Sequence, residues 1–312
     1  MEPVRSHVIT ARDGWRLHVR DVGPLDGPGA VVVAGHAMMV DGRTLLRDDR
    51  PCLAWTLAAA GHRVLVPDLR GHGASGPTAA EGGRWTYEDL VGDVYEYVAL
   101  AAQLAPGRPV ALVGHSLFGH VSLVAAGLDP ARIAWPRVCG LVALAADVWL
   151  PGAEAGAVVE WAKDRLIGVS SRVARRLGRI PARALRLGTC DEPADYWCFF
   201  ERVRAGRFAA PEGTDYLAAM RRVSVPVLHV VSHGDHLLAR PSSARALSAR
   251  VPRADLLEVG RRAGPVGFGP GHVQIVTDPA AGRPVWHRIG AWIRRQADAA
   301  RRALDGAAAP VP

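Results

Sequence analysis

The feature that most constrains the fold is a series of apolar, β-branched runs, each bounded by turn residues and separated from the next by a helical pattern. The runs are AVVVAG at 30–35, HRVLVPDL at 62–69, PVALVG at 109–114, CGLVALAA at 139–146 and VPVLHVVS at 225–232. Strands covered by helices on both faces need such continuous apolar runs. Intervening segments such as TYEDLVGDVYEYVALAAQL carry apolar residues at three- and four-residue spacing. This alternation predicts an α/β fold with a mostly parallel central sheet and helices on both faces.

Two segments depart from that alternation. Near the N-terminus, VITARDGWRLHVRDVG predicts an antiparallel hairpin that turns at Asp13-Gly14 and covers one edge of the sheet. Between 148 and 222 the strand patterns stop, and the segment is helical, arginine-rich and aromatic. We therefore expect one core domain formed by 1–147 and 223–303, with a helical cap inserted at 148–222. Residues 304–312, rich in Ala and Pro, are expected to form a disordered tail.

The charge of the chain is unbalanced, with 38 Lys+Arg against 30 Asp+Glu and a net charge of +8. Lys163 is the only lysine, and 161–188 contains eight basic residues and one acid, Asp164. Because 49% of the residues are hydrophobic, a disordered chain is excluded. A basic excess suggests nucleic acid or an anionic membrane as partner. Because the basic residues are concentrated in the cap, three interpretations follow in order of preference. The first is a solvated helix face, the second is contact with an anionic group of a substrate, and the third is contact with a membrane or nucleic acid.

The cap combines an amphipathic helix with several aromatic residues. One face of the helix is marked by Val159, Ala162, Leu166, Val169, Val173 and Leu177. The other positions are mostly basic: Lys163, Arg165, Arg172, Arg175, Arg176 and Arg179. The aromatic residues have two interpretations, as the lining of an apolar pocket or as packing between the cap and the sheet: Trp149, Trp161, Tyr196, Trp197 and Phe199.

The sequence predicts a cytoplasmic, soluble protein without a membrane span. The first ten residues, MEPVRSHVIT, lack the pattern of a secretion signal, and no apolar run approaches the roughly 20 residues that cross a bilayer. The cysteines, whose spacing matches no zinc or redox motif, are interpreted as buried free thiols: Cys52, Cys139, Cys190 and Cys198. We expect neither a metal nor a cofactor, and the oligomeric state stays open.

The strongest chemical motif follows the third apolar run, where PVALVG leads directly into GHSLFGH and then a helical stretch, VSLVAAGL. A serine on a sharp strand-to-helix turn exposes its hydroxyl, and the next backbone N–H faces any oxyanion that forms. Ser116 is therefore the candidate nucleophile, and Leu117 supplies one backbone donor. The alternative interpretation is that Ser116 only caps the helix.

A nucleophilic serine needs a histidine to take its proton and a carboxylate to orient that histidine. The last apolar run ends in HGDH, which places Asp235 just beyond a strand, and His272 follows in PGHVQIV after the weaker run ADLLEVG. The order Ser116, Asp235, His272 is the order of an α/β hydrolase. Asp147, at the end of the run 139–146, is a second candidate for the acid.

On these motifs the chain resembles the serine hydrolases of the α/β-hydrolase fold over nearly its whole length. The matching segments are VLVPDLRGHGASG at 64–76, GHSLFG at 114–119, VPVLHVVSHGD at 225–235 and PGH at 270–272. AGHAMMV and the cap segment GRIPARALRLGTCDEPADYW are similar to a poorly characterised bacterial branch. The resemblance implies hydrolysis of a carboxylic ester or thioester. The aromatic cap predicts a small, partly apolar substrate, and the arginines of the cap leave an anionic group on that substrate open. An acyltransferase with the same triad and a non-catalytic binding protein are the alternatives.

Two positions depart from the family pattern. Phe118 stands where the elbow usually has a small residue, with glycine only at 119, and this motivates the non-catalytic alternative. After the first core run the chain has Gly35-His36-Ala37-Met38 where the family often has His-Gly-x. Aligning His36 with that histidine makes the Met38 backbone N–H the second oxyanion donor, whereas a slip of one residue gives Ala37.

Other motifs receive structural interpretations. GHGASG at 71–76 has the spacing of a dinucleotide motif, but Pro77 and a polar loop follow it instead of a helix. We read it as a tight loop in which His72 is structural. A metal site formed by His229, His233, Asp235 and His236 is not expected, because His229 lies within a strand and the others lie beyond it. His36 and His115 are expected to pack near the site rather than act as the base, and nucleic acid is not an expected partner.

Overall fold

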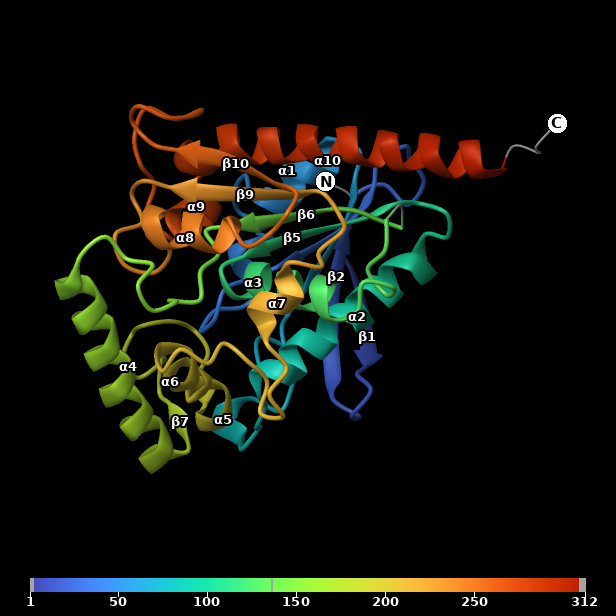
Figure 1. The fold of residues 1–312 in the computed structure, drawn as a ribbon. Helices are drawn as coiled ribbons and strands as arrows, with labels where there is room; N and C mark the ends of the chain where they lie inside the picture. Colours follow the sequence, from blue (N-terminus) through green and yellow to red (C-terminus); the bar gives the residue numbers. More distant parts are fainter. Residues whose placement is uncertain (1–2, 136, 309–312) are drawn as a thin grey trace.

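An eight-stranded sheet in the order β1-β2-β4-β3-β5-β6-β9-β10 forms the centre of the computed structural model, which describes residues 3–135 and 137–308 (Figure 1). The strands are β1 Arg5–Thr10, β2 Arg16–Val22, β3 Val31–Gly35, β4 Arg63–Pro67, β5 Val110–His115, β6 Val138–Leu144, β9 Val227–Ser232 and β10 Ala254–Val259. Among the described strands of this sheet, the β1-β2 and β2-β4 pairs are antiparallel and the other neighbouring pairs are parallel. The predicted α/β fold is confirmed, and each of the apolar runs forms one of its parallel strands.

Helices cover both faces of the sheet and explain why the strands are apolar throughout. Along β3, Val31 and Val33 belong to one hydrophobic cluster, and Val32 and Ala34 belong to the other. Successive side chains of a strand point to opposite faces, so both faces must be apolar when both are covered. The covering helices are α2 Tyr87–Leu104 and α3 Leu117–Leu128 on one face, and α1 Leu53–Ala59 and α10 Pro279–Ala308 on the other.

The N-terminal hairpin forms as predicted. β1 and β2 pair in antiparallel register from Arg5 opposite Asp21 to Thr10 opposite Arg16. At the turn, Gly14 has a φ of 88°, and the Trp15 N–H donates to the Asp13 carboxylate at 3.2 Å. β1 therefore forms one edge of the sheet, as the sequence predicts.

The expected tail begins later than predicted, because α10 continues through Ala308. Its buried face carries Trp286, Ile289, Trp292, Ile293, Ala297 and Ala300. That face anchors the helix, and the following Ala- and Arg-rich residues have high helix propensity, so the helix extends past its last buried side chain. Residues 309–312 of the expected tail lie outside the described residues.

Between β6 and β9 lies the segment for which the sequence predicts a cap, and we call residues 148–222 the cap segment. It contains α4 Ala157–Leu177, β7 Arg179–Ile180, β8 Glu192–Pro193, α5 Ala194–Trp197, α6 Phe199–Arg204 and α7 Tyr216–Met220. The two short strands pair with one another, apart from the main sheet. α7 packs on α3 so closely that a Cβ on Gly127 would lie 2.1 Å from the Ala219 carbonyl oxygen.

Helix α4 turns the apolar face identified in the sequence outward. Leu166, Val169, Val173 and Leu177 are exposed, whereas Lys163 is 1% exposed and lies in the buried strip with Ile167, Ser171 and Ala174. The small Ser171 and Ala174 let α4 approach α5 and α6, and the Glu154 carboxylate accepts a hydrogen bond from the Lys163 ammonium. Amphipathic spacing shows that a helix has two faces, but the partners available in the fold decide which face is buried.

The remaining elements are two short 3-10 helices, η1 Gly42–Thr44 and η2 Ala79–Glu81, together with α8 Pro241–Ser248 and α9 Gln274–Thr277. No helix of the described chain is long and apolar enough to cross a membrane. All four cysteines are free; Cys198 is half-buried and the other three are buried.

Candidate active site

Ser116 occupies a strained turn between β5 and α3. Its backbone has φ 52° and ψ −110°, a conformation that a non-glycine residue rarely adopts. The Ser116 N–H donates to the Leu144 carbonyl on β6 at 2.9 Å, and the Ser116 carbonyl accepts from the first turn of α3. The side chain makes no capping hydrogen bond to the helix. The helix-cap interpretation therefore does not describe what the hydroxyl does here.

His272 and Asp235 form the hydrogen bond that a catalytic histidine needs. The His272 Nδ1–H donates to Asp235 Oδ2 at 2.5 Å, and Asp235 Oδ1 accepts the Leu238 N–H at 2.9 Å. Burial alone would raise the pKa of Asp235, but the bond and charge of His272 hold that pKa below its usual value. The carboxylate stays ionised and fixes the orientation of the imidazole.

Close backbone packing holds the loops that carry these two residues. A Cβ on Gly234 would lie 2.0 Å from the Gly269 carbonyl oxygen, so only glycine fits next to Asp235 at this approach. The Ser232 hydroxyl donates to the Pro270 carbonyl at 2.5 Å. Both loops therefore reach the same end of the sheet in a fixed relation.

His115, the residue before the candidate nucleophile, connects it to the His272 loop. Its Nε2–H donates to the His272 backbone carbonyl at 3.0 Å, and the two rings lie 4.9 Å apart. Burial lowers the pKa of His115 to about 3, with His272 adding to the effect. His115 is therefore neutral. Its contact places the backbone of His272 beside the residue that precedes Ser116, although His272 follows Ser116 by 156 residues in sequence.

His36 has a comparable role at the end of β3. Its Nδ1–H donates to the Ala37 carbonyl at 2.7 Å, and its Nε2 accepts the Leu69 N–H at 2.9 Å. Burial is the main reason that the pKa of His36 falls to about 4. The neutral ring therefore holds the loop that follows β3 against the loop that follows β4.

Glu192 of the cap segment contacts this loop, and sequence reasoning missed it. Its Oε1 accepts the backbone N–H of Met39 at 2.7 Å and lies 3.0 Å from His72 Nε2. Met39 has a φ of 60°, and its carbonyl accepts the N–H groups of Thr189 and Cys190. The bond between Glu192 and Met39 joins residues 153 positions apart, so it leaves no local motif in the sequence.

The buried His72 forms an ion pair with Glu192. Its other nitrogen, Nδ1, donates to the Arg70 carbonyl at 2.8 Å. Burial disfavours the charged imidazolium, but the neighbouring Glu192 carboxylate raises the pKa of His72 above its usual value. His72 therefore joins the loop at 71–76 to the cap segment, which agrees with the structural role predicted for it.

Asp147, the alternative acid, faces a different group. Its Oδ1 accepts the N–H groups of Val148 at 2.7 Å and Trp149 at 3.2 Å. Its Oδ2 lies 3.9 Å from the Lys163 ammonium. Burial raises the pKa of Asp147 to about 6, against the attraction of Lys163. The structure thus joins His272 to Asp235 and places Asp147 in a charge cluster at the base of the cap segment.

The family model described as serine aminopeptidase, S33, matches residues 49–257, well over half of the chain. The chain belongs to this family. The matched residues include Ser116 and Asp235, and His272 lies beyond them. Together with the sheet order, this membership makes the chain an α/β hydrolase, as the resemblance in the sequence implies.

Individual relatives are more distant. The magnesium-chelatase 30 kDa subunit of Rhodobacter capsulatus is 34% identical over 143 residues, which are 45% of this chain and 43% of that protein. The match therefore spans less than half the length of this curated relative. A thioesterase domain from the curacin biosynthetic pathway has a TM-score of 0.55 at 16% identity, covering 94% of this chain and 99% of that domain. A thermophilic esterase from Thermogutta terrifontis has a TM-score of 0.53 at 19% identity, with 94% and 99% covered. These structures share the fold.

The bulky elbow residue of this α/β hydrolase fits because a glycine faces it. Gly35 on β3 lies opposite Gly114 on β5 in the sheet register. An ideal Cβ on Gly35 would lie only 2.1 Å from the Phe118 ring. The ring is fully buried and also contacts Tyr97, with 6.1 Å between the ring centroids. Because Gly35 has no side chain, the neighbouring strand leaves room for the Phe118 ring. In the family pattern a small residue in the elbow avoids the need for this room.

Three of the four residues considered for a metal site contact separate partners. His229 lies 3.1 Å from the Ala146 carbonyl, His233 lies 3.0 Å from Glu258, and Asp235 binds His272. The described part of the chain contains no group of three or more ligand side chains able to hold a metal ion.

Most of the aromatic residues of the cap segment pack inside the protein. Phe199 stacks on Tyr87 of α2 with 3.9 Å between ring centroids, and Tyr196 packs edge-on against Phe200. Trp149 and Trp197 are nearly buried, and only Trp161 is largely exposed. Of the two interpretations, packing between cap and core describes the contacts of Phe199.

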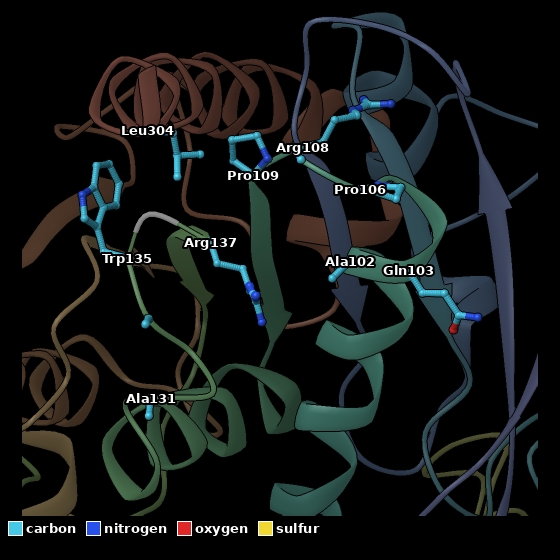
Figure 2. A pocket seen from close by; sticks show the side chains of 11 residues that line it. Ala102, Gln103, Pro106, Arg108, Pro109, Ala131, Trp135, Arg137 and Leu304 are labelled. Atoms are coloured by element: carbon cyan, nitrogen blue, oxygen red, sulfur yellow. The ribbon is translucent and has the colours of Figure 1, made fainter. Parts of the chain in front are cut away.

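A cavity of about 770 Å³ lies at the other end of the strands (Figure 2). Pro109, just before β5, and Trp135 and Arg137, just before β6, line it with Leu304 of α10. Ligands of parallel α/β sheets bind beyond the carboxyl ends of the strands, where Ser116 and Asp235 lie. The cavity also lacks a candidate nucleophile, so it is not part of the candidate active site.

Exchanging each acid for asparagine distinguishes their roles. Asp235→Asn removes the charge that orients His272, so we expect kcat for a p-nitrophenyl ester to fall roughly 10⁴-fold. Asp147→Asn leaves an amide oxygen for the same backbone N–H groups, and we expect a fall below about tenfold. Steady-state kinetics of both variants, with circular dichroism to check folding, measures the difference. A larger loss for Asp147→Asn would contradict the assignment.

Gly35→Ala tests the space beneath Phe118. The new methyl group would overlap the ring, and we expect the free energy of unfolding to drop by roughly 1–3 kcal/mol. Gly92→Ala is the control, because its Cβ would meet no atom within 4 Å and alanine favours the helix α2 by about 0.5–1 kcal/mol. Urea unfolding measures both. If shortening Phe118 to alanine leaves the cost of Gly35→Ala unchanged, the two residues are not coupled.

Proposed function

We propose that the protein is a serine hydrolase that cleaves a carboxylic ester or thioester through an acyl-enzyme on Ser116. The observation that carries this proposal is the Asp235–His272 hydrogen bond of 2.5 Å, formed beside a serine held in a strained turn. The His115 contact joins the two halves of that arrangement. Family membership supports hydrolysis, and the fold of the esterase and thioesterase described above supports an acyl substrate.

In the proposed mechanism His272 uses the nitrogen that does not face Asp235. With Nδ1–H on the carboxylate, Nε2 takes the proton of the Ser116 hydroxyl as the oxygen attacks the substrate carbonyl carbon. The same proton then passes to the leaving alcohol or thiol. Water, deprotonated by His272, next attacks the acyl carbon, the bond to the Ser116 oxygen breaks, that oxygen takes the proton back from His272, and the acid is released. Asp235 stays ionised throughout and stabilises the imidazolium.

Two backbone N–H groups are proposed to bind the oxyanion. One belongs to Leu117, the first residue of α3, where the helix dipole also favours negative charge. The other belongs to Met38, with Ala37 as the alternative. The Met39 N–H is excluded because Glu192 already accepts it. One such donor is worth about 3 kcal/mol in the transition state.

The acyltransferase alternative uses the same residues, and no described contact favours it. The non-catalytic alternative rested on Phe118, and the space above Gly35 removes that objection. The proposed substrate is a small, partly apolar ester or thioester. The arginines of the cap segment suggest that this substrate carries an anionic group.

Ser116→Ala is the direct test of the proposed nucleophile. We expect turnover of short p-nitrophenyl esters to fall by roughly 10⁴-fold or more, and labelling by a fluorophosphonate probe to disappear. Ser6→Ala, at an exposed serine on β1, is the control and should keep both. Thermal unfolding checks that each variant folds. Retained turnover or labelling in Ser116→Ala would refute the proposed nucleophile.

Substitutions of Glu192 test whether the cap segment positions the loop after β3, which carries the proposed oxyanion donor Met38. Glu192→Ala leaves the Met39 N–H unpaired, and we expect kcat to fall about 10²-fold with little change in KM for a small ester. Glu192→Gln keeps an oxygen for that N–H and should lose less. Equal kcat in wild type and Glu192→Ala would show that the loop holds its shape without Glu192.

The ion pair between His72 and Glu192 predicts that the stability of the protein depends on pH. His72 has a raised pKa in the folded protein, so its stabilisation is complete below about pH 6.5 and disappears as pH rises through the raised value. The difference in free energy of unfolding between wild type and Glu192→Gln should therefore be largest in mild acid and shrink at higher pH. Urea unfolding across this range measures it.

A further inference from the structure

Helix α4 presents a long apolar stripe to solvent. Six large hydrophobic side chains, at 38–78% exposure, lie on its outward side: Val158, Trp161, Leu166, Val169, Val173 and Leu177. At 100° per residue they fall on one side of the helix, opposite the buried strip that contains Lys163 and Ile167. Apolar surface of this extent on one helix indicates an interaction site.

Three arginines lie on the same side of the helix, between Trp161 and most of the aliphatic side chains of this stripe. Helical spacing places Arg165, Arg172 and Arg176 on the same side as Trp161, and the Arg165 guanidinium lies 5.8 Å from the Trp161 ring centroid. Arg172 donates to Gly168 of its own helix. No ion pair joins these three arginines to an acid within residues 3–135 and 137–308. The stripe and these arginines together are named the α4 face.

Further exposed apolar side chains lie close in sequence to Asp235 and His272. Leu237 and Leu238 follow Asp235, Val273 follows His272 and Phe268 precedes it by four residues, each at least 37% exposed. This group is connected to the start of α4. Glu154 binds both Lys163 of α4 and Arg240 of the loop after β9, the latter at 3.2 Å.

We propose that the α4 face docks on an anionic lipid membrane surface, with α4 lying in the plane of the interface. A helix of this kind inserts its apolar side chains about 5–10 Å into the headgroup and acyl boundary, while arginines bind lipid phosphates. Trp161 is of the residue type enriched at that depth. The net charge of +8 adds long-range attraction to the same surface.

Charge and composition favour a membrane over the other occupants of such a face. A second copy of the chain would bring arginines of one α4 against those of the other, and like charges oppose that contact. A nucleic acid would use the arginines and stack on Trp161, but it offers nothing to the five aliphatic side chains. Anionic lipid satisfies both the charges and the apolar stripe. Docking does not require catalysis, so it stands or falls independently of the proposed function.

Vesicle co-sedimentation of the full chain tests the proposal. We expect binding to phosphatidylcholine vesicles that contain about 30% phosphatidylglycerol, weak binding to phosphatidylcholine alone, and loss of binding at about 500 mM salt. Replacing Arg165, Arg172 and Arg176 together by glutamine should weaken binding roughly 100-fold, about fivefold for each arginine. Figure 1 shows α10 along the top of the molecule and α4 at the lower left. Arg302→Gln, at an exposed arginine of α10, is the charge control and should bind with at most about a fivefold loss.

A matched pair of valines tests the apolar part. Val169 on α4 is 58% exposed and Val8 on β1 is 57% exposed. Val169→Ser should weaken vesicle binding roughly tenfold, and Val8→Ser should leave it unchanged. Absence of binding to the anionic vesicles, or equal losses for the two serine variants, would overturn the proposal. Two further results would overturn it. One is a dimer in sedimentation equilibrium that Val169→Ser dissociates, and the other is binding of RNA by a protein that does not bind the vesicles.

Discussion

Parallel pairing of β3, β5, β6 and β9 aligns the carboxyl ends of these strands at one edge of the sheet. Gly35 lies opposite Gly114, and His115 lies opposite Leu144. Backbone hydrogen bonds set this register, so the loop after β3, the turn at Ser116 and the loop of Asp235 meet without attraction between their side chains. Two short-range contacts add to this arrangement: the His115 bond to the His272 loop and the close approach of Gly234 and Gly269 beside Asp235. The candidate site therefore depends on sheet register more than on any single polar contact.

Two buried ion clusters join the cap segment to this frame. Glu192 binds His72 and the Met39 N–H, and Glu154 binds Lys163 and Arg240. Burying charge is costly unless each group is paired, so such clusters tolerate one arrangement of the cap segment and penalise others. The single lysine of the chain is used in this way. Because these contacts bury the face of α4 that carries its polar and small side chains, the apolar stripe of α4 faces solvent.

Much of the fold and part of the site could be predicted because the responsible signals are local. Continuous apolar runs require two covered faces, and the structure confirms their strands. Ser116 follows one strand and Asp235 another, and strand ends are visible in the sequence. The choice between Asp235 and Asp147 was not local, since it depends on which carboxylate His272 reaches. The tail was predicted too early because Ala-rich composition suits both a frayed end and a continued helix.

By itself, the sequence determined the alternation of strands and helices, the mostly parallel sheet and the serine turn, because periodicity and turn chemistry act over a few residues. Tertiary structure alone decided which face of α4 is buried, where Phe118 finds space and which residue of the cap segment holds the loop that follows β3. The Phe118 ring depends on Gly35, and the Met39 N–H depends on Glu192, across 83 and 153 residues of chain. Contacts at such separations follow from packing and charge pairing in three dimensions, which leave no period in the sequence.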